Sequence, residues 1–274
     1  MRRLQIFRFH PGSYGFWQKS RGGDISGTLI FGKQHPALEF TSHRPWPLPR
    51  RKWILRQRWL NLVFLHWEID YIDLRKRIPN DLEIDLHDGK AWIAIVPFDM
   101  RAVTLRYFPA FSPLSNFPEI NVRTYVVHNG KPGVWFFSLD APSRFAVWAA
   151  KTFFNLPYRH GDVKIEDQNG IHHYTSQVGE DRFDSIYQPI TGAAALGKGS
   201  FEEWCTERYC LYCQSNEGHL YRTEVQHQKW PLQNAEIDLR KNSLLDRFNV
   251  GERRPSVLYS ESIDVVAYAP ERIA

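Results

Sequence analysis

Polar side chains alternate with apolar ones in the segment FPEINVRTYV, residues 117–126. Side chains alternate faces along a β-strand, so Glu119, Asn121, Arg123 and Tyr125 are expected to share one face. A carboxylate, an amide and a guanidinium together offer proton transfer, hydrogen bonding and anion binding. The question is whether this face lies in water or lines a pocket.

The next stretch of sequence favours the pocket. Residues 133–140, GVWFFSLD, follow the turn signal Asn129-Gly130 and are expected to form the second strand of a hairpin. Their apolar residues are consecutive, which indicates that both faces of this strand are covered. Since paired strands share their faces, the Glu119 side should be part-enclosed. The alternative is a surface ion pair between Glu119 and Arg123, but four positions along a strand are too far for direct contact.

A second polar group follows the clearest helical pattern in the sequence, residues 143–155, SRFAVWAAKTFFN, with Ser143 as N-cap. Helical spacing predicts a broad buried face formed by Phe145, Trp148, Ala149, Thr152 and Phe153. A proline ends this helix, and Tyr158, Arg159 and His160 come directly after it. Side chains at such a rigid junction are candidate binding groups, although a surface turn fits the local sequence as well.

The cysteines Cys205, Cys210 and Cys213 have the C-x4-C-x2-C spacing that opens a plant-type iron–sulfur site. That site needs four thiolates, and the chain has three cysteines. On a strand Cys210 and Cys213 would also point to opposite faces. We therefore interpret all three as small buried hydrophobic residues. No histidine lies in an HExxH or similar pattern, so neither a metal site nor a cofactor is predicted.

The remaining patterns predict a β-rich α+β fold. Strands are expected at residues 58–69, 91–98, 119–127, 133–140, 208–214, 219–226 and 256–269. Short helices are expected at residues 71–78, at 143–155, and from Ser200, whose spacing to Glu203 is that of a capping box. Many strands with few short helices indicate an antiparallel sheet that is curved or closed.

Charge is distributed unevenly. Residues 1–58 carry 12 Lys and Arg against 2 Asp and Glu, whereas the rest of the chain is mildly acidic. We interpret residues 1–42 as a basic extension that is either poorly ordered or loosely attached, residues 43–52 as an extended segment laid onto the body, and residues 43–274 as a single domain. Without a dense basic run, a long apolar stretch or a signal-peptide core, neither nucleic acid nor membrane is an expected partner, and a cytoplasmic location is expected.

Several of these segments together resemble the YqjF-like family of bacterial proteins, which is grouped with the acetoacetate decarboxylase-like superfamily. The resemblance rests on FPEINVRTYV, GVWFFSLDA, TERYCLY and H-x-x-WPLQ, and it covers about residues 43–245. LRKRIPNDLEI (74–84) and AVWAAKTFFNLPYR (146–159) are similar to helix–proline segments of the decarboxylases. The resemblance implies a β-barrel or cone with an internal cavity.

The resemblance also assigns roles, with one departure. Glu119 falls where the decarboxylases carry an active-site glutamate, and Arg58 roughly matches a substrate-binding arginine. Tyr158 and Arg159 stand where the decarboxylases have the Schiff-base lysine and the lysine that lowers its pKa. Tyrosine cannot form an imine, so Schiff-base decarboxylation by this route is not expected.

The predicted function is therefore the binding of a small anionic or carbonyl compound in an internal cavity. Glu119 and Tyr158 would be the catalytic acid–base groups. The candidates for substrate binding are Arg58, Arg123, Arg159 and His160. A lysine-independent lyase or hydratase is one interpretation, and a non-catalytic ligand-binding or structural protein is the other. Either one is compatible with a homo-oligomer.

Overall fold

The computed structural model describes residues 35–111, 115–193, 197–250 and 254–274, and within these ranges 14 strands form one connected sheet. The strands are β1 (Leu55–Ile69), β2 (Glu83–Ile84), β3 (Ala91–Leu105), β4 (Phe117–His128), β5 (Lys131–Ala141), β6 (Tyr158–His160), β7 (Asp162–Gln168), β8 (Ile171–Val178), β9 (Asp181–Ala193), β10 (Cys210–Gln214), β11 (Leu220–His227), β12 (Leu232–Asn242), β13 (Ser256–Ala267) and β14 (Glu271–Arg272). The helices are η1 (Pro36–Leu38), α1 (Tyr71–Arg75), α2 (Arg144–Phe154) and α3 (Phe201–Thr206). No helix in the described ranges has the length and apolar character needed to span a membrane.

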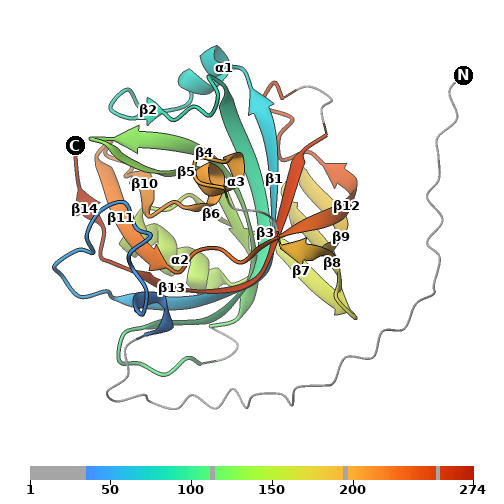
Figure 1. Ribbon diagram of the computed structural model, residues 1–274, viewed down its shortest axis with the longest axis horizontal. Helices are drawn as coiled ribbons and strands as arrows, with labels where there is room; N and C mark the ends of the chain where they lie inside the picture. The colour runs from blue at the N-terminus through green and yellow to red at the C-terminus, as the bar shows by residue number, and fades with distance from the viewer. Residues whose placement is uncertain (1–34, 112–114, 194–196, 251–253) are drawn as a thin grey trace, which may run out of the picture.

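Strand β13 closes the sheet on itself because it pairs with β1, β11 and β12. Its contact with β11 joins β1, β3, β4, β5, β10, β11 and β13 into a ring (Figure 1). Neighbours in the ring are antiparallel, except that β10 runs parallel to β5. The predicted β-rich fold with a closing curved sheet is confirmed, and the closure takes the form of this ring.

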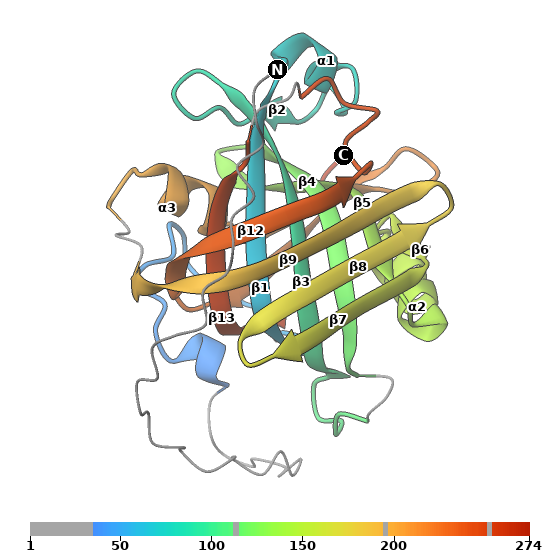
Figure 2. The ribbon, with the colours of Figure 1, turned by 90° about the vertical axis from the view of Figure 1, so that its right-hand side faces the viewer.

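Strands β7, β8, β9 and β12 continue from β13 as a second layer, which crosses the outer face of the ring (Figure 2). One apolar core lies between the layers and includes Val63 and Leu65 of β1 with Tyr174 and Phe183 of the second layer. The other core includes Leu62 and Phe64 of β1 with Val96, Phe136 and Val225, which lie inside the ring. Alternate residues of one strand therefore supply two different cores.

A break in β1 keeps its inner face continuous. Asn61 has a φ of 53°, a left-handed conformation that asparagine tolerates better than most residues, and the pairing with β3 shifts register between Leu60 and Leu65. As a result Gln57 and Trp59 share the inner face with Leu62 and Phe64, although the alternation of the strand is interrupted between them.

The predicted buried face of α2 is wrong. Phe145, Trp148 and Phe153 are 54%, 54% and 60% exposed, and their rings contact one another. Val147 is the buried residue of this helix, whose cap Ser143 accepts a hydrogen bond from the Ala146 amide as predicted. Apolar spacing shows which residues share a helix face, but it does not show whether another element covers that face.

The described part of the predicted N-terminal extension contacts the body. Residues 1–34 lie outside the described residues, whereas Ala37 is fully buried and its carbonyl oxygen accepts a hydrogen bond from Gln226. The Pro36 carbonyl oxygen accepts another from Gln228. Pro36 and Ala37, which the predicted boundary assigned to a loosely attached extension, are therefore held by β11 and the residue directly after it.

Gly133→Ala is expected to lower the free energy of unfolding by about 1–3 kcal/mol, because β5 and β10 approach too closely for a side chain. A Cβ at Gly133 would stand 2.4 Å from the Cys210 carbonyl oxygen and 2.7 Å from Cys210 Cβ. Urea denaturation measures the change. The control is Gly197→Ala, where the nearest atom to the added Cβ is Ser200 Cβ at 3.9 Å. Equal stabilities for the two variants would contradict this account.

Candidate active site

A cavity of about 80 Å³, measured by the space open to the centres of water molecules, lies inside the ring. A single water needs about 10–15 Å³ on this measure, so the cavity has room for several waters or a small ligand. Its wall is mostly apolar. The polar side chains that line it include Glu119, Asn121, Arg123, Tyr158, Arg208 and His227.

The polar face of β4 faces this cavity. Glu119, Asn121 and Arg123 are 2%, 4% and 8% exposed, and all of them line the cavity wall. The partner strand β5 contributes Val134, Phe136 and Leu139 to the same wall. The expectation that this face is enclosed rather than solvated is confirmed, and its basis was the apolar partner strand.

Strand β6 brings Tyr158 to Glu119. It pairs in parallel with β5, with Tyr158 opposite Leu139, and the Tyr158 hydroxyl donates a hydrogen bond to Glu119 Oε2. Burial raises the pKa of Glu119 to about 7, against the opposing effect of hydrogen bonds from Tyr158 and Asn121. Burial, the nearby charge of Glu119 and their hydrogen bond raise the pKa of Tyr158 well above its ordinary value. Near neutral pH, Glu119 is thus able both to accept and to release a proton.

Arg159 and His160 lie outside the cavity, although they adjoin Tyr158. Strand alternation turns Arg159 to the outer side, where its guanidinium bonds both oxygens of Asp140 at 2.7 and 2.8 Å and one oxygen of Asp181 at 2.6 Å. His160 is exposed. Arg159 therefore fastens β6 to β5 and β9, and it has no free side toward a ligand in the cavity.

Arg58 also lies outside the cavity. Because Gln57 and Trp59 face inward, Arg58 faces outward and binds both oxygens of Asp264 on β13 at 2.9 Å. Its side chain is 52% exposed. The structure thus brings together Glu119, Tyr158 and Arg123 among the predicted site residues, and it separates Arg58, Arg159 and His160 from them.

Arg208 and His227 line the cavity but were not among the predicted site residues. Arg208 follows α3 and is ion-paired with Asp85, while His227 ends β11. Burial lowers the pKa of His227, so its ring is neutral at pH 7. A signal was present in the sequence, since Arg208 lies in TERYCLY and His227 begins H-x-x-WPLQ, two of the motifs that carried the family resemblance.

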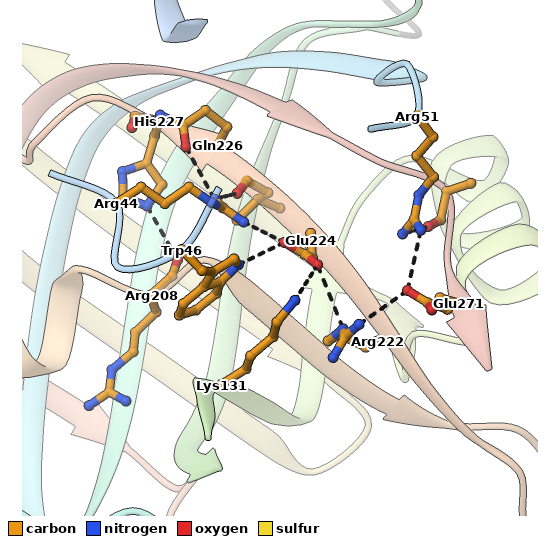
Figure 3. A network of polar contacts seen from close by, with 12 residues as sticks. Arg44, Trp46, Arg51, Lys131, Arg208, Arg222, Glu224, Gln226, His227 and Glu271 are labelled. Atoms are coloured by element: carbon orange, nitrogen blue, oxygen red, sulfur yellow. Dashed lines mark hydrogen bonds and ion pairs between the residues drawn. The ribbon is translucent and has the colours of Figure 1, made fainter. Parts of the chain in front are cut away.

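Behind this wall, a network of polar contacts ties the N-terminal segment to β11 (Figure 3). Glu224 accepts hydrogen bonds from Arg44 at 2.5 Å, from Trp46 at 2.9 Å and from Lys131 at 2.9 Å. Arg44 also donates to the Val225 carbonyl oxygen at 2.6 Å. The network holds the outer face of β11, and the inner face of the same strand presents Val225 and His227 to the cavity.

The cysteine thiols take no part in this site. Cys205, Cys210 and Cys213 are free thiols and all are buried, which confirms the interpretation of these residues as small core residues. Burial raises the pKa of each thiol to about 12, so none is a thiolate at neutral pH.

The ring with its second layer matches structures already solved. An acetoacetate decarboxylase from Legionella pneumophila superimposes with a TM-score of 0.59 at 13% sequence identity, covering 84% of this chain and 93% of that chain. The enduracididine biosynthesis enzyme MppR, solved in complex with pyruvate, superimposes with a TM-score of 0.60 at 10% identity, covering 81% and 90%. At these identities the likeness shows the fold alone. The chain has the acetoacetate decarboxylase-like fold.

Sequence similarity defines the family. The uncharacterized protein YqjF of Bacillus subtilis (strain 168) is 39% identical over 224 residues, which are 80% of this chain and 92% of that protein. Residues 56–264 match the model of DUF2071, described as an uncharacterized conserved protein family. The chain belongs to the DUF2071 family, and the predicted family resemblance is confirmed.

Proposed function

We propose that this protein binds a small carbonyl or anionic compound in the ring cavity and that Glu119 and Tyr158 exchange protons with it. One observation carries the proposal: a hydrogen-bonded carboxyl–phenol pair is buried in a largely apolar cavity, and the pKa of the carboxyl is about 7. Strongly shifted ionisable groups in a cavity are typical of catalytic sites.

The pair is suited to acid–base chemistry at carbon next to a carbonyl group. Ionised Glu119 takes a proton from that carbon, the electron pair of the C–H bond forms the C=C bond of an enolate, and the π pair of the carbonyl group moves onto its oxygen. Protonated Glu119 then donates to the Tyr158 oxygen, which turns the phenol hydrogen toward the enolate oxygen. Enolisation of this kind is the shared first step of lysine-independent dehydration and aldol-type reactions.

The side chains that line the cavity support a route without an imine. In the described part of the chain they comprise no lysine, and Tyr158 occupies the position that the family resemblance matches to the nucleophile. Incubation with acetoacetate and sodium borohydride is therefore expected to leave the mass of the protein unchanged. A solved decarboxylase treated in parallel is the positive control. A stable adduct on any lysine would overturn the lysine-independent route.

Deuterium exchange tests the proposal directly. The protein is incubated in D2O at pH 7 with pyruvate, acetoacetate and longer oxo acids, and NMR follows the loss of the protons beside each carbonyl group. Pyruvate belongs in this panel because MppR was solved in complex with it. We expect exchange faster than in buffer for at least one compound. Binding without any acceleration of exchange would favour the alternative, a non-catalytic ligand-binding protein in which Glu119 and Tyr158 satisfy each other.

A further inference from the structure

Strand β4 places a carboxyl group and a guanidinium at two separate positions in the cavity. Glu119 and Arg123 both project into it from β4, four residues apart, which is about 13 Å along a strand. Tyr158 joins Glu119 at one of these positions. Arg208 lies with Arg123 at the other position, because both guanidiniums lie beside the ring of Tyr125. The Arg208 guanidinium is 5.0 Å and the Arg123 guanidinium 5.8 Å from the centroid of that ring.

Arg123 is a buried cation that forms no ion pair with any described residue. It is 8% exposed, its Nη2 lies 3.5 Å from the Cys205 carbonyl oxygen, and its Nε is buried without a hydrogen-bond partner. The ring of Phe64 lies 5.4 Å from the guanidinium. Contacts with rings offset part of the cost of burying this charge, but an unpaired buried guanidinium remains costly unless an anion pairs with it.

Arg208 has one side of its guanidinium free. It is 6% exposed, its Nη1 is ion-paired with Asp85, and its Nη2 is buried without a partner. His66 adds no charge, because burial and the charge of Arg123 lower its pKa well below the ordinary value. The group made by Arg123, Arg208 and Asp85 therefore has one positive charge more than its carboxylate balances.

We infer that Arg123 and Arg208 bind the carboxylate of the ligand, and that its reacting carbonyl group lies several bonds away, beside Glu119 and Tyr158. This inference rests on the proposed function. The cavity wall includes the apolar side chains Phe64, Val96 and Phe136, which suit a methylene chain. Val96 pairs with Asn121, midway between Glu119 and Arg123 on β4. The ligand class is then an oxo acid whose carbonyl is separated from its carboxylate by two or more methylene groups, such as 4-oxopentanoate or 5-oxohexanoate.

Calorimetry at pH 7 with three simple probes tests the carboxylate subsite. Hexanoate is expected to bind at least about tenfold more tightly than the neutral 2-hexanone, since a charged hydrogen-bonded pair forms only with the acid. Arg123→Met and Arg208→Met should each abolish that preference. Arg58→Met is the matched control, because it removes an arginine of the outer face and should leave the preference unchanged. Methyl phosphate, the third probe, should bind more weakly than hexanoate.

Each contrary result has a defined meaning. Equal binding of hexanoate and 2-hexanone, an equal loss in Arg58→Met, or tighter binding of methyl phosphate would each overturn the carboxylate subsite. If Arg208→Met does not fold because Asp85 loses its partner, the double variant Arg208→Met with Asp85→Asn replaces it. Arg123→Met leaves no carboxylate unpaired among the described residues, so its thermal midpoint without ligand should be unchanged or higher.

The deuterium-exchange panel separates this inference from the proposed function. If both arginine variants lose hexanoate binding while no oxo acid shows exchange, the arginine subsite stands and the acid–base role of Glu119 fails. If pyruvate exchanges faster than 5-oxohexanoate and its exchange is indifferent to Arg123→Met, the acid–base role stands and the arginine subsite fails. We expect 5-oxohexanoate to exchange fastest. Arg123→Met should raise the KM for exchange of 5-oxohexanoate.

Discussion

Glutamine in place of Glu119 is expected to slow proton exchange on a bound oxo acid by about 10²–10⁴-fold, the usual contribution of a positioned acid–base group. The amide neither accepts nor releases a proton at neutral pH, yet its oxygen still accepts the hydrogen bond from Tyr158, so the cavity keeps its shape. NMR in D2O measures the rate. The control is Asp264→Asn, which changes a carboxylate paired with Arg58 on the outer face and should leave the rate unchanged.

The same substitution is expected to change how stability depends on pH. The ordinary pKa of the Glu119 carboxyl is 4.5 and its pKa in the folded protein is about 7, so between these values the folded state binds more protons than the unfolded state. The free energy of unfolding therefore falls as pH rises through this window, by about 3 kcal/mol in all. The amide of Glu119→Gln does not ionise, so the variant does not lose this stability as pH rises. It should therefore be more stable than the original chain at pH 8. Urea unfolding at pH 5 and pH 8 makes the comparison, and parallel pH profiles would contradict the assigned burial effect.

The second large effect is expected at Arg44. Arg44→Met should lower the free energy of unfolding by about 3 kcal/mol, because it leaves the buried carboxylate of Glu224 without its closest cation. Lys131 and Trp46 still contact Glu224, which limits the loss. Urea denaturation measures it.

The matched control is Arg51→Met. Arg51 is paired with Glu271 at 3.2 Å, and the two side chains are 37% and 45% exposed, so this variant should lose no more than about 1 kcal/mol. If the two variants lost equal stability, the N-terminal segment would not be fastened through the buried network of Figure 3.

The enclosed face of β4 could be predicted because its evidence is local. The partner strand follows after a two-residue turn, Asn129-Gly130, so alternation along one strand and apolar cover on the next are read from about 25 consecutive residues. The second layer was missed, although Asn169-Gly170 separates β7 from β8 in the same way. Its strands carry many polar residues on the outer face, which weakens the apolar pattern.

Which side chains line the cavity depends on strand pairings between segments that lie far apart in the sequence. Alternation requires that Tyr158 and Arg159 face opposite sides, but the register of β6 against β5 decides which of them faces inward. The same argument separates Arg58 from Trp59. Arg208 reaches the cavity through the segment between α3 and β10, which nothing near Arg208 in the sequence places beside β4. Family motifs marked Arg208 as a residue to consider, but they did not give it a role.

Because β13 pairs with both β1 and β11, the ring cannot close until β13 has been synthesised. During synthesis β13 follows its neighbour β1 by roughly 190 residues, which take about 10–40 s of translation at ordinary rates. Until then the edge of β1 that will face β13 has no partner and the cavity has no closing wall. Between the synthesis of β1 and that of β13 the nascent chain thus carries an open strand edge, which is exposed to pairing with other chains.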